Sequence, residues 1–184
     1  MNSFYTALQD ALNQGKDIVM ATAVDHLVEF SDSYDVLISQ KAFRCSDLVT
    51  AETPSMGQFW QAVFSAPPEE LPNIVAQDSW WTFFDPLEHP FPTGVLEKLA
   101  GGETLVLAIV IAKASTAPQY AAVKLAVDKD GTLYGTLGDS ALDAGVVQNA
   151  QSVLEEYTPR LWECSVSGED GQDSTLRILL DPIN

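Results

Sequence analysis

Basic residues, cysteines and histidines are scarce in this chain, and each shortage excludes a class of protein. Nine Lys and Arg stand against 26 Asp and Glu in 184 residues, which gives a net charge of −17. Such an acidic surface repels phosphate groups, so we expect no binding to nucleic acid or to anionic membranes. Two cysteines, Cys45 and Cys164, are too few for a disulfide framework or a zinc site, and we expect both thiols to be reduced.

Long apolar runs and catalytic motifs are missing as well. No segment approaches the roughly 18 apolar residues of a membrane-spanning helix. The start, MNSFYTALQD, lacks the basic and apolar regions of a signal peptide, so we expect a cytoplasmic location. His26 and His89 lie in no HxxxH or CxxH spacing, and no GxSxG, P-loop or GxGxxG motif occurs. An independent enzyme is therefore the least favoured class of function.

The two halves of the chain share a sequence pattern. Residues 4–24, FYTALQDALNQGKDIVMATAV, align without a gap with residues 91–111, FPTGVLEKLAGGETLVLAIVI. Near the ends of the halves, FFDPL aligns with LLDPI at a larger offset, which predicts an insertion in the second half, most simply in SGEDGQDST. We therefore predict two diverged copies of one unit, residues 1–87 and 88–184, related by an approximate two-fold axis.

Each predicted unit has the order helix, strand, strand, helix, strand, strand, which is typical of an α/β fold with mixed sheets and packed helices. Apolar spacing predicts helices around Leu8 and Val95, followed by the buried strands IVMATAV and LVLAIVI. In the second unit, DKDG predicts a hairpin, and Ser140 is expected to cap a helix to Glu156 with Asp143 as its capping partner. RLWECSV and TLRILLD are the predicted closing strands. In the first unit, MGQFWQAVF is the predicted second helix, and DVLIS, NIVAQ and WWTFFDP are predicted strands.

An ordered set of short motifs follows in the second unit. The strand GETLVLAIVI leads to STAP, then to a DG turn, and then to GTLG at the start of a helix; TLRILLDP closes the chain. This order resembles the N-terminal domain of the XdhC/CoxI family, the maturation factors of xanthine dehydrogenase and related molybdenum hydroxylases. The resemblance implies that the molybdenum cofactor is a candidate ligand. It also implies a set of cofactor-binding residues in the STAP and GTLG motifs: Ser115, Thr116, Pro118, Gly135, Gly138, Asp139 and Ser140.

The chain departs from the family pattern where the chemistry would lie. Ala141 and Gln172 occupy the positions of two family cysteines, and Gln119 occupies that of an arginine. Asp139 replaces a glycine in a turn whose N–H groups, at a helix N-terminus, would suit a phosphate. Its carboxylate can satisfy those N–H groups itself and opposes an incoming anion. We therefore expect no tightly bound cofactor. Three interpretations of this turn stay open: an ordinary capped helix, an altered cofactor pocket, or a cation site on Asp139 and Asp143.

Two functions remain. The first is a non-catalytic accessory or scaffold protein that resembles molybdenum-cofactor maturation factors and binds a molybdenum hydroxylase or another maturation factor. The second is a protein that binds a small, pterin-like molecule in the cleft between the two units. The acidic charge fits solubility alone or a docking face for a basic partner. The sequence predicts no particular oligomeric state.

Overall fold

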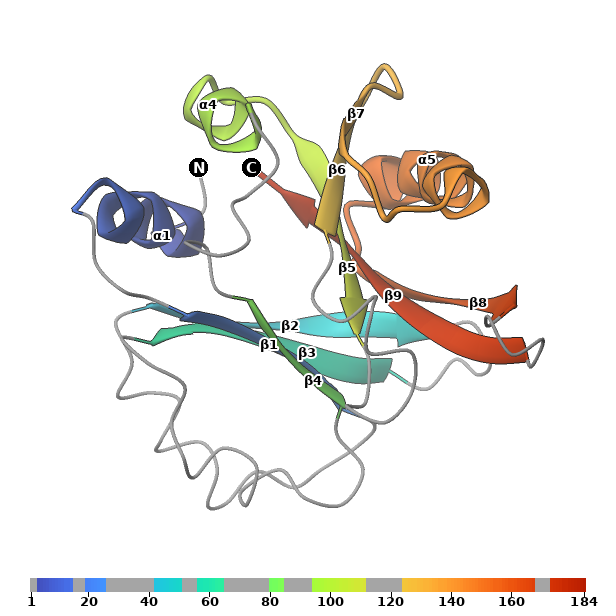
Figure 1. The fold of residues 1–184 in the computed structure, drawn as a ribbon. Coiled ribbons are helices and arrows are strands. Elements are labelled where there is room, and N and C mark those ends of the chain that lie inside the picture. The colour runs from blue at the N-terminus through green and yellow to red at the C-terminus, as the bar shows by residue number, and fades with distance from the viewer. Residues whose placement is uncertain are drawn as a thin grey trace.

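The computed structural model describes eight stretches of the chain: residues 3–14, 19–25, 42–50, 56–64, 80–84, 94–111, 124–167 and 173–184. They form, in chain order, α1 (Ser3–Asn13), β1 (Val19–Asp25), β2 (Ala42–Thr50), β3 (Met56–Phe64), β4 (Trp80–Phe84), α4 (Val95–Ala100), β5 (Leu105–Ile111), β6 (Lys124–Asp128), β7 (Leu133–Gly135), α5 (Ser140–Glu156), β8 (Arg160–Ser167) and β9 (Asp173–Ile183) (Figure 1). None of these helices is long and apolar enough to cross a membrane.

The strands of the described residues form one sheet in the order β4-β1-β3-β2-β8-β9-β5-β6-β7. Neighbouring strands are antiparallel except for β2 and β8, which run parallel. That contact is short, because it pairs only Val49 with Arg160 and Thr50 with Leu161. The sheet therefore consists of a four-stranded antiparallel part from the first half and a five-stranded antiparallel part from the second half.

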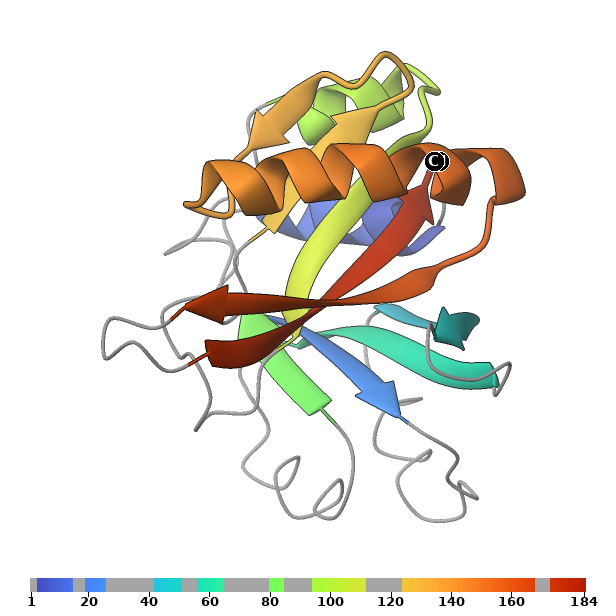
Figure 2. The same cartoon turned by 90° about the vertical axis from the view of Figure 1, so that its right-hand side faces the viewer.

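Helices cover both faces of the second part of the sheet. α1 and α4 lie on one face, and α5 lies across the other (Figures 1 and 2). Alternate residues of β5 point to opposite faces, so Leu107 and Ile109 pack with α1 and α4, whereas Val106 and Ala108 pack with α5. Every side chain of β5 is buried. This confirms the prediction for LVLAIVI, because a strand covered on both faces reads as a continuous apolar run.

The first helix packs into the core of the second half. Phe4, Tyr5, Leu8 and Ala11 of α1 lie in one apolar cluster with residues of α4, β5 and β9. Met20 of β1 belongs to the same cluster. Burial of each large apolar side chain stabilises the fold by about 1.5–3 kcal/mol. The two halves are therefore joined by a shared core as well as by the sheet.

The halves share only part of their topology. In each, the strand after the first helix pairs antiparallel with the last strand of that half, β1 with β4 and β5 with β9. Each half also has an antiparallel hairpin-like pair, β2 with β3 in the first half and β6 with β7 in the second. β5 pairs with the first strand of its pair, β6, whereas β1 pairs with the second strand of its pair, β3. The structure thus shows the mixed α/β class but not the repeated αββαββ order or the two-fold axis. The division into residues 1–87 and 88–184 stays a prediction.

The predicted helix at MGQFWQAVF is wrong, since these residues form β3. Phe59, Trp60 and Phe64 therefore lie on a strand. β3 sits between β1 and β2 and pairs with both along its length, so tertiary pairing uses its backbone groups. Aromatic residues also favour strands, and Gly57 disfavours a helix. The structure confirms WWTFF, RLWECSV and TLRILLD as strands β4, β8 and β9. DVLIS and NIVAQ lie outside the described residues.

Candidate functional site

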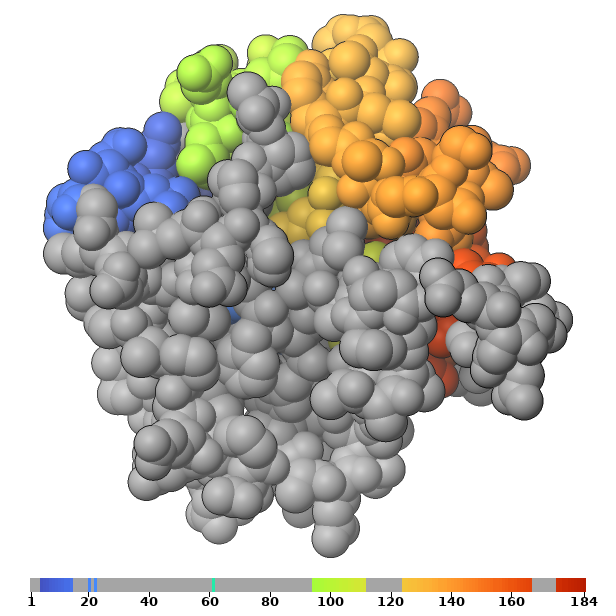
Figure 3. All heavy atoms as spheres, viewed as in Figure 1, coloured from blue at the N-terminus to red at the C-terminus, as the bar shows by residue number. Residues whose placement is uncertain are grey.

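The predicted site residues fall into two groups. Gly135, Gly138, Asp139 and Ser140 belong to the α5 turn, the name used here for residues 135–143, which connects β7 to the first turn of α5. Ser115, Thr116 and Pro118 lie outside the described residues, as do Gln119 and Gln172. In a space-filling view, the residues of α4, the β6–β7 connection and α5 lie together on one side of the molecule (Figure 3).

Two glycines shape the α5 turn. Gly135 has φ +90° and Gly138 has φ +88°, both in the left-handed region that glycine adopts without strain. The chain therefore leaves the sheet edge at Gly135 and enters the helix at Ser140 within a few residues. The GTLG motif thus has a backbone role in this structure, because its glycines set the direction of α5.

Asp139 is the N-cap of α5. Its backbone is extended, and its Oδ1 accepts hydrogen bonds from the backbone N–H groups of Ala141, at 2.7 Å, and Leu142, at 3.1 Å. The prediction that Ser140 caps the helix is wrong by one residue, since Ser140 is the first residue of the helix itself. A carboxylate at this position satisfies two backbone donors and also interacts favourably with the positive end of the helix dipole.

A second carboxylate closes the turn from inside the helix. Asp143 Oδ1 accepts a hydrogen bond from the backbone N–H of Leu137 at 2.8 Å, and its Oδ2 accepts one from the Thr136 hydroxyl at 2.6 Å. The Thr136 hydroxyl oxygen in turn accepts a bond from the N–H of Gly138 at 2.9 Å. Asp143 therefore does not form the predicted capping pair with Ser140; it reaches back to the residues before the helix.

The chain's own side-chain oxygens accept hydrogen bonds from several backbone N–H groups of the α5 turn. Four backbone N–H groups that face this turn, those of Leu137, Gly138, Ala141 and Leu142, donate to side chains within it. Among the described residues, no group of three or more His, Cys, Asp or Glu side chains is placed to hold a metal ion. The arrangement is that of a capped helix, and an anion would have to displace these bonds to reach the N–H groups.

Cys164 of β8 lies near this turn, which the sequence did not predict. Its thiol is free and half-buried, with its Sγ 4.0 Å from the carbonyl oxygen of Leu176. Burial raises the pKa of the Cys164 thiol, and the negative charge of Asp139 raises it further. The thiol therefore stays protonated at neutral pH, which makes it a poor nucleophile and a poor metal ligand. The side chain of Cys45 lies outside the described residues.

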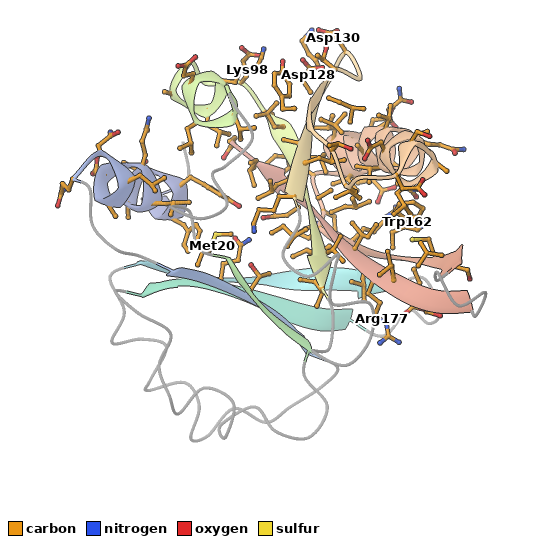
Figure 4. The ribbon with its side chains drawn as sticks, viewed as in Figure 1. Met20, Lys98, Asp128, Asp130, Trp162 and Arg177 are labelled. Carbon is orange, nitrogen blue, oxygen red and sulfur yellow. The ribbon has the colours of Figure 1, made fainter. Side chains whose placement is uncertain are left out.

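α5 is positioned over β8 by a close contact. The Trp162 side chain lies between β8 and α5, and it packs against Gly145 (Figure 4). A Cβ atom at Gly145 would overlap the indole ring. The missing side chain thus lets the helix lie close to the strand, and this fixes where the N-terminus of α5 sits relative to Cys164.

A second polar group lies where the two halves meet. The Tyr5 hydroxyl contacts Gln61 Oε1 and Asp181 Oδ2, both at 3.3 Å, and all three residues are fully buried. Asp181 interrupts the apolar run of β9. Lys124 of β6 is also buried, and burial lowers its pKa well below the ordinary value.

Comparison with known proteins bears on the second half. Residues 99–164 match the model of the XdhC and CoxI family, over a little more than a third of the chain. The matched segment contains β5, β6, β7, the α5 turn and α5, and it extends to Cys164 of β8. No curated protein matches the sequence. This match confirms the resemblance seen in the motifs, and it shows that residues 99–164 are similar to the XdhC and CoxI family.

Proposed function

We propose that this protein is a non-catalytic accessory factor in the maturation of molybdenum hydroxylases, acting in the cytoplasm. It binds a hydroxylase or another maturation factor and does not itself carry the molybdenum cofactor. The family of residues 99–164 supports the role in maturation. One observation carries the second part of the proposal: the carboxylates of Asp139 and Asp143 accept hydrogen bonds from three N–H groups of the α5 turn, those of Leu137, Ala141 and Leu142.

Electrostatics supports this interpretation of the turn. A cofactor phosphate at these N–H groups would lie within a few ångströms of a carboxylate. Two like charges about 4 Å apart repel by about 1–4 kcal/mol, from bulk water to an effective dielectric constant of about 20. Because each 1.4 kcal/mol is a factor of ten, one carboxylate lowers the affinity by about 5-fold to 1,000-fold. Release of the existing hydrogen bonds adds to this cost.

Sulfur chemistry is also disfavoured at the turn. Ala141 carries no thiol at the position where the resemblance places a cysteine. The thiol nearby, that of Cys164, has a raised pKa and is therefore mostly protonated. Since the thiolate is the form that binds metals and attacks sulfur, neither residue supplies it. We infer that binding to a protein partner is the activity that remains.

The charge of the chain indicates the kind of partner. With a net charge of −17, the protein attracts basic surfaces and associates with them faster at low salt. A hydroxylase or maturation factor with a basic docking face would fit this charge.

A pterin-like ligand in a cleft between the halves is the alternative function. At that junction, the side chains of Tyr5, Gln61 and Asp181 are fully buried, and the Tyr5 hydroxyl contacts both of the others. This packing favours the accessory role over a ligand of that size.

Sedimentation of purified proteins tests the accessory role. The full chain is mixed with a cofactor-free molybdenum hydroxylase from the same organism, and complex formation is followed by analytical ultracentrifugation at low and high salt. We expect a complex that weakens with salt and is unchanged by Asp139→Asn, which keeps the cap but removes its charge. Absence of a complex with hydroxylases and with maturation factors would contradict the proposal.

A further inference from the structure

Thr22 and Gln61 lie side by side under α1. They are direct partners on β1 and β3, and such partners project from the same face of a sheet. Met20, two residues before Thr22 on β1, shares this face and lies between the sheet and α1 (Figure 4). Thr22 is 1% exposed and Gln61 is 0% exposed. Both polar side chains are thus enclosed beside the apolar cluster that contains Met20.

Tyr5 and Asp181 complete the group. The Tyr5 hydroxyl has one hydrogen for two acceptors, Gln61 Oε1 and Asp181 Oδ2. Both distances are 3.3 Å, longer than the roughly 2.7–2.8 Å that is usual for such bonds. Tyr5, Thr22, Gln61 and Asp181, called here the junction cluster, therefore meet from α1, β1, β3 and β9 without closing tightly on one another.

The Thr22 hydroxyl distinguishes the junction cluster from an ordinary buried network. Its Oγ1 is buried and has no hydrogen-bond partner in the described part of the chain. Buried hydroxyls are almost always paired, because an unpaired one loses its bonds to water and gains none in the protein. A hydroxyl can donate one bond and accept two, and a water molecule can serve as its partner in either kind of bond.

We propose that the junction cluster binds one ordered water molecule, held by the Thr22 hydroxyl and by the neighbouring oxygens of Gln61 or Asp181. Internal waters occupy polar sites of this kind and make two to four hydrogen bonds there. The water links β1 and β3 of the first half to α1 and to β9 of the second half. The contact between the two halves is therefore hydrated at its polar centre and apolar around it.

Water relaxation measurements on the full chain test this site. Magnetic relaxation dispersion of water oxygen-17 detects internal waters with long residence times. We expect Thr22→Val, which keeps the shape but removes the hydroxyl, to lose the dispersion amplitude of one such water. Thr22→Ser, which keeps the hydroxyl, is the matched control and should retain the amplitude. Equal amplitudes in the unchanged protein and in Thr22→Val would overturn the proposal.

A crystal structure of the unchanged protein provides a test that does not depend on how the variants fold. The expected result is a single spherical density peak within hydrogen-bonding distance of Thr22 Oγ1, in contact with a second oxygen of the junction cluster. Two results would overturn the proposal: a Thr22 hydroxyl that turns to a protein acceptor with no peak beside it, or the elongated density of an organic ligand.

Discussion

The carboxylate of Asp143, in the first turn of α5, accepts a hydrogen bond from the backbone N–H of Leu137, which lies before the helix. Together with the cap formed by Asp139, this hydrogen bond links the residues before α5 to the first turn of the helix. The chain thus keeps the glycines of the GTLG motif, and its own acidic side chains accept hydrogen bonds from the N–H groups of Leu137, Ala141 and Leu142.

Removal of the helix cap should destabilise the protein. We expect Asp139→Ala to lower the free energy of unfolding by about 0.5–2 kcal/mol, because the N–H groups of Ala141 and Leu142 lose their acceptor. Asp139→Asn keeps an acceptor and should lose much less. Urea denaturation of the two variants measures the difference. Equal stability of Asp139→Ala and the unchanged protein would show that the cap contributes nothing.

The packing of α5 on β8 predicts an unusual response to a glycine substitution. Gly145→Ala should destabilise the protein by about 1–3 kcal/mol, although alanine is the better helix former, because the new methyl group overlaps Trp162. In a Trp162→Leu background, which makes room, the same substitution should cost less. Thermal unfolding of the unchanged protein, the two single variants and the double variant gives this comparison. A stabilising Gly145→Ala in the unchanged background would contradict the contact.

The turn between β6 and β7 should make stability depend on acid pH. Burial alone would raise the pKa of Asp128, but hydrogen bonds from Thr132, Tyr134 and Asp130 lower it below its ordinary value. The Asp128 carboxylate therefore binds a proton more tightly in the unfolded chain than in the folded one. Its contribution to stability is complete above the ordinary pKa of about 3.9, and it is lost as the pH falls through the lower pKa of the folded state.

The matched variant for this pH dependence is Asp128→Asn, which cannot titrate. The difference in unfolding free energy between the unchanged protein and this variant should be constant near pH 6 and should shrink below about pH 4. Denaturation at a series of pH values measures it. A difference that grows as the pH falls would mean that the pKa of Asp128 is raised instead.

The influence of Asp139 on Cys164 can be measured chemically. The charge of Asp139 contributes to the raised pKa of this thiol, so Asp139→Asn should lower that pKa and speed up alkylation by iodoacetamide near pH 8. Mass spectrometry of the peptide that contains Cys164 separates its reaction from that of Cys45. Burial is the larger cause of the shift and persists in the variant, so the increase should be modest. An unchanged or slower rate would contradict the proximity.

Several elements of the second half could be predicted from the sequence, because residues close to one another in the chain determine them. The apolar run of β5, the DKDG turn and the length of α5 all follow from patterns that span a few residues. The cap lies one residue earlier than predicted: Asp139 and Ser140 are both good capping residues, and the sequence does not show which of them has the extended backbone.

Features that depend on the tertiary structure could not be predicted in this way. The local pattern of β3 predicts a helix, whereas its pairing with β1, about 35 to 45 residues earlier in the chain, makes it an inner strand of the sheet. The contact of Tyr5 with Asp181 joins residues near opposite ends of the sequence. The same applies to Cys164 and Asp139, which approach one another only because α5 packs on β8.

Titration of the purified protein with molybdopterin, under anaerobic conditions and with and without magnesium, tests the central claim most directly. We predict no tight binding in either condition, because the carboxylates of Asp139 and Asp143 already accept hydrogen bonds from three N–H groups of the α5 turn. Asp139→Gly, which restores the glycine of the family pattern, should bind more tightly than the unchanged protein. Tight binding by the unchanged protein without magnesium would contradict the claim, and tight binding only with magnesium would make Asp139 a cation ligand in an altered cofactor pocket.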